Sequence, residues 1–207
     1  MDRALSFFGV YDVFGYLASG LSAVVGVWWV VEGSIPHLSI VALLGLLGGS
    51  YIAGHLTAIL GNIWERLWWR WKGKKPYTRL IEEDSRDFHR ALRIAISSRI
   101  ESEVGVRDLD ARERFNLARA KLRLDGFEQR AETMRAMHGL CRNLVGAAAV
   151  ICVAAIGTGV VDGGEARLTV TAVSSFLAIW AFLWRALKFE YRFGREVWLS
   201  YLALRMS

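Results

Sequence analysis

The chain has 207 residues, of which 54% are hydrophobic and 22% are charged, and its formal net charge is +6. That charged fraction is ordinary for a soluble protein, whereas the apolar fraction is high. Both hold only if the two kinds of residue are segregated, which excludes a single ordinary soluble domain. Cys141 and Cys152 fall at or within one apolar run, and the histidines lack metal-site spacing. We therefore expect no disulfide, metal or cofactor.

Four charge-free apolar runs predict transmembrane helices over residues 13–31, 38–63, 144–161 and 168–184. Each fits the range of roughly 17 to 25 residues that a helix needs to cross a bilayer, the second with a few to spare for tilt. The first run is longer than the core of a signal peptide, and no small-residue cleavage pattern follows it. We expect it to remain as a span.

Basic residues near the spans predict the topology. The two short loops between spans contain one of them, Arg167, whereas residues 64–142 carry nineteen Lys and Arg against thirteen Asp and Glu. The positive-inside rule then places the centre and both termini in the cytoplasm. The sequence predicts an all-α integral membrane protein, with four transmembrane helices and a cytoplasmic helical hairpin between spans 2 and 3. Its expected parts are transmembrane hairpins at 1–63 and 143–184, a cytoplasmic helical domain at 64–142 and a cytoplasmic amphipathic tail at 185–207.

The central segment begins with a Trp- and Arg-rich stretch, residues 64–72, which suits the lipid headgroup layer. A platform for stacking nucleobases is the alternative use of these residues. Apolar periodicity predicts a helix from about residue 82 to 104, stopped by Gly105. A second helix is expected from about Ala111, started by Asp108 or Asp110. Asp125-Gly126 should interrupt or bend it before it continues into the third span.

Rows of arginine on these two helices are candidate ligand-binding residues. Arginine binds phosphate through paired donors, so a multi-subunit ring of such rows could hold a nucleotide or a short single-stranded oligonucleotide. Interleaved carboxylates leave an ion-paired, solvated helix face as the alternative. The candidates are Arg86, Arg90 and Arg93 on the first helix and Arg112, Arg119, Arg123 and Arg130 on the second.

Polar residues within the membrane are the second candidate set. Tyr51, His55 and Asn62 fall on one side of span 2, and Asp12 lies at the cytoplasmic mouth of span 1. Such groups line a wet path or form hydrogen bonds between helices. The same span has a ridge of small residues at every fourth position, Gly45, Gly49 and Ala53. No hydrolase, metalloprotease or phosphate-loop motif occurs, so we do not expect an enzyme.

Two strings resemble small bacterial four-span membrane proteins of antiphage defence operons. They are the opening Phe7-Phe8-Gly9-Val10-Tyr11-Asp12-Val13-Phe14-Gly15-Tyr16-Leu17, and Tyr51-Ile52-Ala53-Gly54-His55-Leu56 followed by Gly61-Asn62. The resemblance covers the first third of the chain. Ala18-Ser19-Gly20 departs from that group, which often has Pro before the Gly. One such class, the Hailong system, pairs a nucleotidyltransferase with an oligomeric channel gated by an oligodeoxyadenylate. No ligand-binding residue is carried over by motif.

The resemblance implies a channel-forming or membrane-disrupting effector in the bacterial inner membrane. We expect a homo-oligomer, with a tetramer favoured, whose partners are the lipid bilayer and a nucleotide or oligonucleotide that gates it through the central helices. The alternative is a non-conducting anchor that recruits a soluble partner from the same operon. A small transporter is disfavoured because no span is interrupted in corresponding halves.

Overall fold

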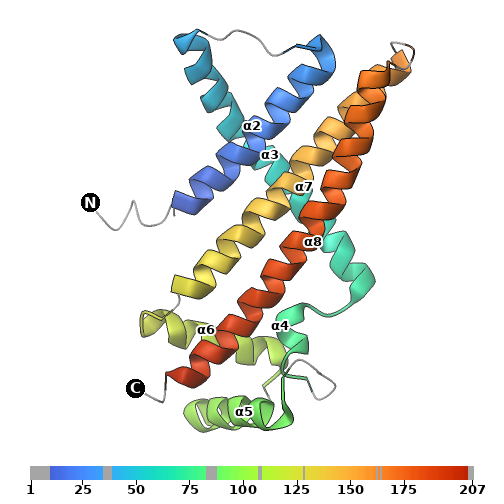
Figure 1. Ribbon diagram of the computed structural model, residues 1–207. Coiled ribbons are helices and arrows are strands. Elements are labelled where there is room, and N and C mark those ends of the chain that lie inside the picture. Colours follow the sequence, from blue (N-terminus) through green and yellow to red (C-terminus); the bar gives the residue numbers. More distant parts are fainter. Residues whose placement is uncertain are drawn as a thin grey trace. The chain divides into compact units, whose positions relative to one another are not determined.

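The computed structural model describes residues 10–34, 39–82, 88–106, 109–127, 129–161, 163 and 165–204. Within these ranges every regular element is a helix, as the sequence predicts. In chain order the helices are α2 (Val10–Glu32), α3 (Ile40–Lys72), α4 (Pro76–Arg79), α5 (Arg90–Val104), α6 (Ala111–Leu124), α7 (Gln129–Val161) and α8 (Ala166–Ala203) (Figure 1).

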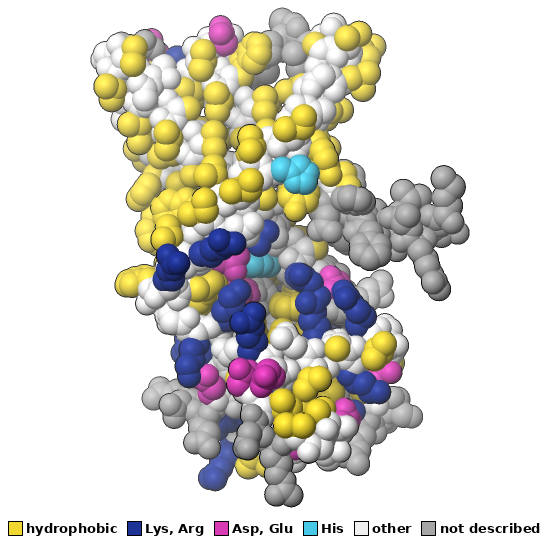
Figure 2. Space-filling view, turned by 180° about the vertical axis from the view of Figure 1, so that it is seen from behind, with side chains coloured by type: hydrophobic (Ala, Val, Ile, Leu, Met, Phe, Trp, Pro, Cys, Tyr) yellow, Lys and Arg dark blue, Asp and Glu magenta, His cyan; other side chains and the backbone are white. Residues whose placement is uncertain are grey.

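Four helices, α2, α3, α7 and α8, are long and apolar enough to cross a membrane, which confirms the predicted number of candidate spans. Three of them, α3, α7 and α8, continue past the predicted apolar runs into charged sequence. Many of their apolar side chains are exposed, for example Val41 at 79% and Val161 at 82%. Figure 2 shows hydrophobic side chains over much of this surface. Lipid suits such a surface, whereas water would drive it to associate.

The chain forms two compact units. The first unit comprises residues 1–68 and 136–186, and the second comprises residues 69–135 and 187–207. Helices α3, α7 and α8 each contribute residues to both units. Residues 187–207 thus belong to the same unit as the central segment, whereas the sequence analysis treats the tail as a separate part.

Local sequence signals set the ends of α5 and α6. The His89 side chain accepts a hydrogen bond from the N–H of Ala91 at the start of α5, and Gly105 ends that helix with φ +73°. Asp110 accepts from the N–H of Glu113 at 2.7 Å, and Glu113 accepts from the N–H of Asp110 at 2.9 Å. This reciprocal capping box satisfies donors that a helix start leaves free. The predicted stop at Gly105 and start at Asp110 are confirmed.

The interruption predicted at Asp125-Gly126 is a full break. Helix α6 ends at Leu124, Gly126 has φ +76°, and α7 begins at Gln129. From there α7 continues to Val161, so the third candidate span and the charged segment before it form one helix. The first central helix begins at Arg90, later than the predicted residue 82, and residues 83–87 lie outside the described ranges.

Aromatic side chains form the core of the second unit. Phe115 of α6 stacks on Tyr77 of α4 at a centroid distance of 4.4 Å, and it meets Phe193 and Trp198 of α8 edge to face. Trp198 is fully buried, and its indole N–H donates to the carbonyl oxygen of Tyr77 at 3.1 Å. The end of α8 therefore completes a core that α5 and α6 do not form as an isolated hairpin. The other buried members are Leu80, Ile81, Phe88, Ile96, Ile100, Ala118, Leu122, Ala131, Val197 and Tyr201.

A polar network ties the end of α8 to α5. The Arg99 guanidinium donates to the carbonyl oxygens of Tyr201 and Leu202, which the helix end leaves without intrahelical donors. The Tyr201 hydroxyl donates to Glu103 at 2.8 Å. Burial pushes the pKa of Glu103 up, but hydrogen bonds from Arg99 and Tyr201 outweigh this and leave it below its usual value. Burial and the bond to Glu103 raise the pKa of Tyr201.

Tyr201→Phe should weaken this network by about 1 kcal/mol at neutral pH, the usual net value of one hydrogen bond. A lowered carboxyl pKa stabilises the fold above the usual Glu range, and this contribution is lost as pH falls through the lowered pKa. The effect of the substitution should therefore shrink in acid. Hydrogen exchange of the α5 amides measures it. A double-mutant cycle with Glu103→Gln is the control, and zero coupling between the two positions would contradict the network.

Candidate functional site

Helices α2 and α3 touch through their backbones. A Cβ atom added to Gly20 would overlap the carbonyl oxygen of Ser50, and one added to Gly54 would overlap that of Tyr16. Both positions therefore require glycine for the helices to approach this closely. In lipid such approach replaces the hydrophobic effect as the source of helix association, since acyl chains are as apolar as leucine.

Helices α3 and α7 make the same kind of contact one to two turns further along α3. A Cβ at Gly146 would overlap the carbonyl oxygen of Thr57, and one at Gly61 would overlap that of Arg142. The packed face of α3 thus consists of Ser50, Gly54, Thr57, Ala58 and Gly61. The ridge noted in the sequence is a different face, because Gly45 and Gly49 have nothing within 4 Å.

Buried polar groups lie at these crossings. The Thr57 hydroxyl donates to Ser19 Oγ at 3.1 Å, and the two side chains are 2% and 0% exposed. Ser50 Oγ and Asn143 Oδ1 are also buried, and they have no hydrogen-bond partner among the described residues. The sequence analysis singled out neither Thr57 nor Asn143, because isolated hydroxyl and amide residues are common in transmembrane helices.

The predicted intramembrane residues Tyr51 and His55 come together on an accessible face of α3. His55 is exposed, and its ring stacks on Tyr16 of α2 at 4.2 Å with an interplanar angle of 22°. Tyr51 is half-buried and meets His55 edge to face at 4.9 Å. Asn62 is half-buried and does not join this cluster. The side chain of Asp12 lies outside the described residues.

A charged cluster links the ends of α3 and α7. Glu65 Oε2 lies 3.8 Å from His138 Nε2 and 3.5 Å from Arg142 Nη1. The side chains are partly buried, at 15%, 13% and 25% exposure. The sequence signal was present, because His138 and Arg142 are four residues apart on one helix face just before the third apolar run. Their partner on α3 is 77 residues from Arg142 in sequence, so the pairing was not predictable.

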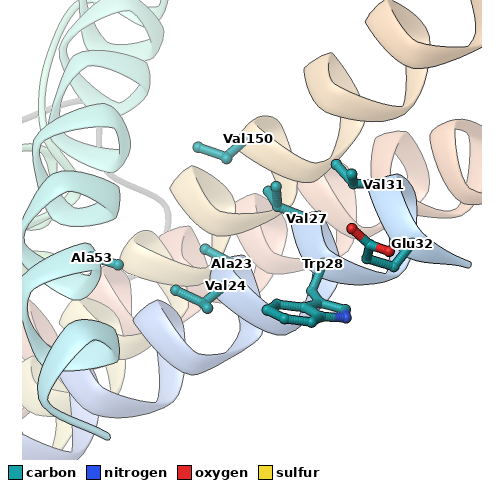
Figure 3. Close-up of a pocket in the computed structure, with 8 residues that line it drawn as sticks. All are labelled: Ala23, Val24, Val27, Trp28, Val31, Glu32, Ala53 and Val150. Atoms are coloured by element: carbon teal, nitrogen blue, oxygen red, sulfur yellow. The ribbon is translucent and has the colours of Figure 1, made fainter. Parts of the chain in front are cut away.

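An apolar groove of about 430 Å³ lies between α2, α3 and α7 (Figure 3). Among the described residues that line it, Glu32 is the single ionisable one, and its side chain lies beside that of Trp28. With so few polar groups, the groove suits a hydrocarbon chain better than a polar substrate. The remaining lining residues are Ala23, Val24, Val27, Val31, Ala53 and Val150.

Three arginines of the predicted α6 and α7 row have carboxylate partners in the second unit. Arg119 donates to Glu132 at 2.9 Å and Arg123 lies 3.9 Å from the same carboxylate, whereas Arg130 pairs with Glu196 at 3.3 Å. This is the ion-paired arrangement that the sequence analysis kept as its alternative.

The other predicted arginines differ among themselves. Arg93 donates to the carbonyl oxygen of Glu82, while Arg90 and Arg112 are exposed and their side chains pair with no described residue. Arg86 lies outside the described ranges. Arg90 and Arg112 are therefore the described members of the predicted set whose side chains have no described partner, although Arg123 and Arg130 are also well exposed, at 69% and 77%.

Comparison of the chain with protein-family models, with curated proteins and with solved structures finds no match.

Gly54→Ala should destabilise the first unit by about 1–3 kcal/mol, because the added methyl group meets backbone that has no room to move. Gly157→Ala on α7, another candidate span, is the matched control. Its Cβ has open space, and alanine favours helix over glycine by about 1 kcal/mol, so it should be neutral or stabilising. Thermal unfolding in detergent compares the two, and equal melting temperatures would contradict the crossing described here.

Proposed function

We propose that the chain is a homo-oligomeric ion channel or membrane-disrupting effector of bacterial antiphage defence, with a nucleotide or oligonucleotide as its ligand. It would act in the inner membrane with both termini in the cytoplasm, as the distribution of basic residues favours. The observation that carries the proposal is the exposed imidazole of His55 on a candidate membrane span. A polar ionisable group facing acyl chains is costly, so such residues usually face another helix or water.

A second copy of the chain would provide a protein surface against His55, which is exposed in a single copy. The N-terminal half of α3 also has little cover from its own chain, since Ile40 is 80% exposed and Leu44 is 65% exposed. Gly45 and Gly49 leave open space on that half of the helix. Another helix could approach there as closely as α2 approaches Gly54. In an oligomer the Tyr16, Tyr51 and His55 cluster would then lie at a subunit boundary or along a wet path.

Gating in this proposal depends on the second unit. A ligand shifts an open and closed equilibrium only through different affinity for the two states. Arg90 and Arg112 are available to a phosphate group, whereas Arg119 and Arg130 would first have to leave Glu132 and Glu196. Exchange of these carboxylates for phosphates is one way in which a ligand could distinguish the two states.

The second candidate function is a non-conducting membrane anchor that recruits a soluble partner. The ion pairs of Arg119 and Arg130 favour it, because Glu132 and Glu196 already pair with these cations within the second unit. This alternative predicts no conductance, and it predicts that substitutions at Tyr51, His55 and Asn62 are tolerated.

The deciding experiment is reconstitution. The protein purified in detergent should form a defined oligomer, and liposomes containing it should conduct ions in a way that short oligonucleotides change. His55→Leu should weaken self-association by about three- to seventeenfold, since polar contacts between membrane helices contribute about 0.6–1.7 kcal/mol. Conductance should fall with it.

Ile59→Leu is the matched control, because Ile59 is 56% exposed one turn further along α3. It should leave the oligomer and the flux unchanged. A monomer whose liposomes stay silent with every ligand would overturn the channel proposal and favour the anchor.

A further inference from the structure

Helix α8 continues beyond its apolar run with basic residues on one face. Lys188, Arg192 and Arg195 are all exposed and recur at spacings of four and three, which places them along one side of a helix. Arg185 occupies the preceding position of the same register. The opposite side of this segment is buried in the core of the second unit through residues such as Trp198 and Tyr201.

The stripe is defined as Lys188, Arg192 and Arg195, and the acidic residues of the same segment do not pair with its two arginines. Glu190 is buried at 5% exposure and pairs with Lys75 at 3.7 Å. Glu196 flanks the stripe but pairs with Arg130 of α7 at 3.3 Å. Arg192 and Arg195 form no ion pair or hydrogen bond through their side chains with any described residue. The two arginines of the α8 stripe thus carry positive charge without a described carboxylate partner, unlike the paired row on α6 and α7.

The direction of α8 aims the stripe back toward the candidate span. In a helix every Cα–Cβ bond tilts toward the N-terminus, and the apolar run of α8 is N-terminal to the stripe. Trp184, which is 63% exposed, ends that run one turn before Lys188. Trp at a span end marks the headgroup layer. At about 1.5 Å of rise per residue, Arg192 and Arg195 lie roughly 12 and 16 Å beyond Trp184, and their long side chains shorten that distance.

We propose that the α8 stripe binds the headgroups of anionic phospholipids in the leaflet where the span ends. Guanidinium groups match phosphate through paired N–H donors, and basic residues just past a span are attracted to anionic lipid within a Debye length of about 8–10 Å. The inference requires that α8 spans a membrane, but it does not require conduction. Its test is therefore separate from the test of the proposed function.

The experiment measures lipid binding to the full-length protein in neutral detergent by native mass spectrometry. The probes are dioctanoyl phosphatidylglycerol and dioctanoyl phosphatidylcholine, which share their chains and differ in headgroup charge. The double variant Arg192→Gln/Arg195→Gln should bind phosphatidylglycerol about 25-fold more weakly, from roughly fivefold for each cation, and its phosphatidylcholine binding should not change.

The matched control is Arg79→Gln/Lys121→Gln, which makes the same change of charge at exposed cations of α4 and α6 outside the predicted ligand set. It should retain phosphatidylglycerol binding. Arg192→Lys/Arg195→Lys keeps the charge and should retain most of the affinity, which separates charge from any effect on folding. Equal losses in stripe and control variants would overturn the proposal, as would no loss in the stripe variant. If a short single-stranded oligonucleotide displaces the lipid from the parent protein but not from the stripe variant, the stripe would be reassigned to nucleic-acid binding.

Discussion

Close backbone contact at a few glycines holds the first unit together, and the rest of that unit follows from it. In lipid a helix gains little by packing leucine on leucine, so association needs shape and hydrogen bonds. Helix α3 meets α2 at Gly54 and α7 at Gly61 and Gly146. The hydroxyl pair of Ser19 and Thr57 lies buried between these contacts. Once this face of α3 is committed to its two neighbours, the side that carries His55 is left exposed.

The second unit follows the rules of a water-soluble core. Phe115, Phe193 and Trp198 bury large aromatic areas, and the indole N–H of Trp198 has an acceptor at Tyr77. Helix α8 therefore presents two different kinds of surface along its length. Its first half exposes apolar side chains such as Val170, at 65%, whereas its second half buries aromatic ones and exposes cations. One uninterrupted helix can present both surfaces. Its apolar side keeps the same helical register throughout, but it covers most of the helix in the first half and only one side in the second.

Local signals in the sequence were sufficient for most of the fold. Charge-free runs predicted the four long helices, and Gly105, Asp110 and Gly126 marked helix ends through their own backbone and capping preferences. The packed face of α3 was not predictable, since Gly45-Gly49 and Gly54-Gly61 are both rows of small residues. Only the position of α2 and α7 distinguishes them.

Some residues of the site were predictable, but their pairings were not. Tyr51 and His55 share a helix face by spacing alone, whereas the stacking of His55 on Tyr16 depends on how α2 crosses α3. The tail at 185–207 was predicted to be amphipathic, yet a membrane surface and a protein core demand the same pattern. The pairing of Arg130 with Glu196 joins residues far apart in sequence, so no local rule identifies it.

The arginine pairs bear on function through what a ligand would have to change. Ion pairs at a protein surface contribute at most about 1 kcal/mol, and Arg130 is 77% exposed, so a phosphate could displace Glu196 at little cost. The pairing therefore favours an anchor only slightly, because it still permits a gated channel. What matters is that Arg130 belongs to α7 and Glu196 to α8, two of the three helices that contribute to both units. A ligand that draws Arg130 away removes a contact between them within the second unit. Binding there would alter the pairing of the helices that continue into the candidate spans, which a ligand bound to α5 alone would not do.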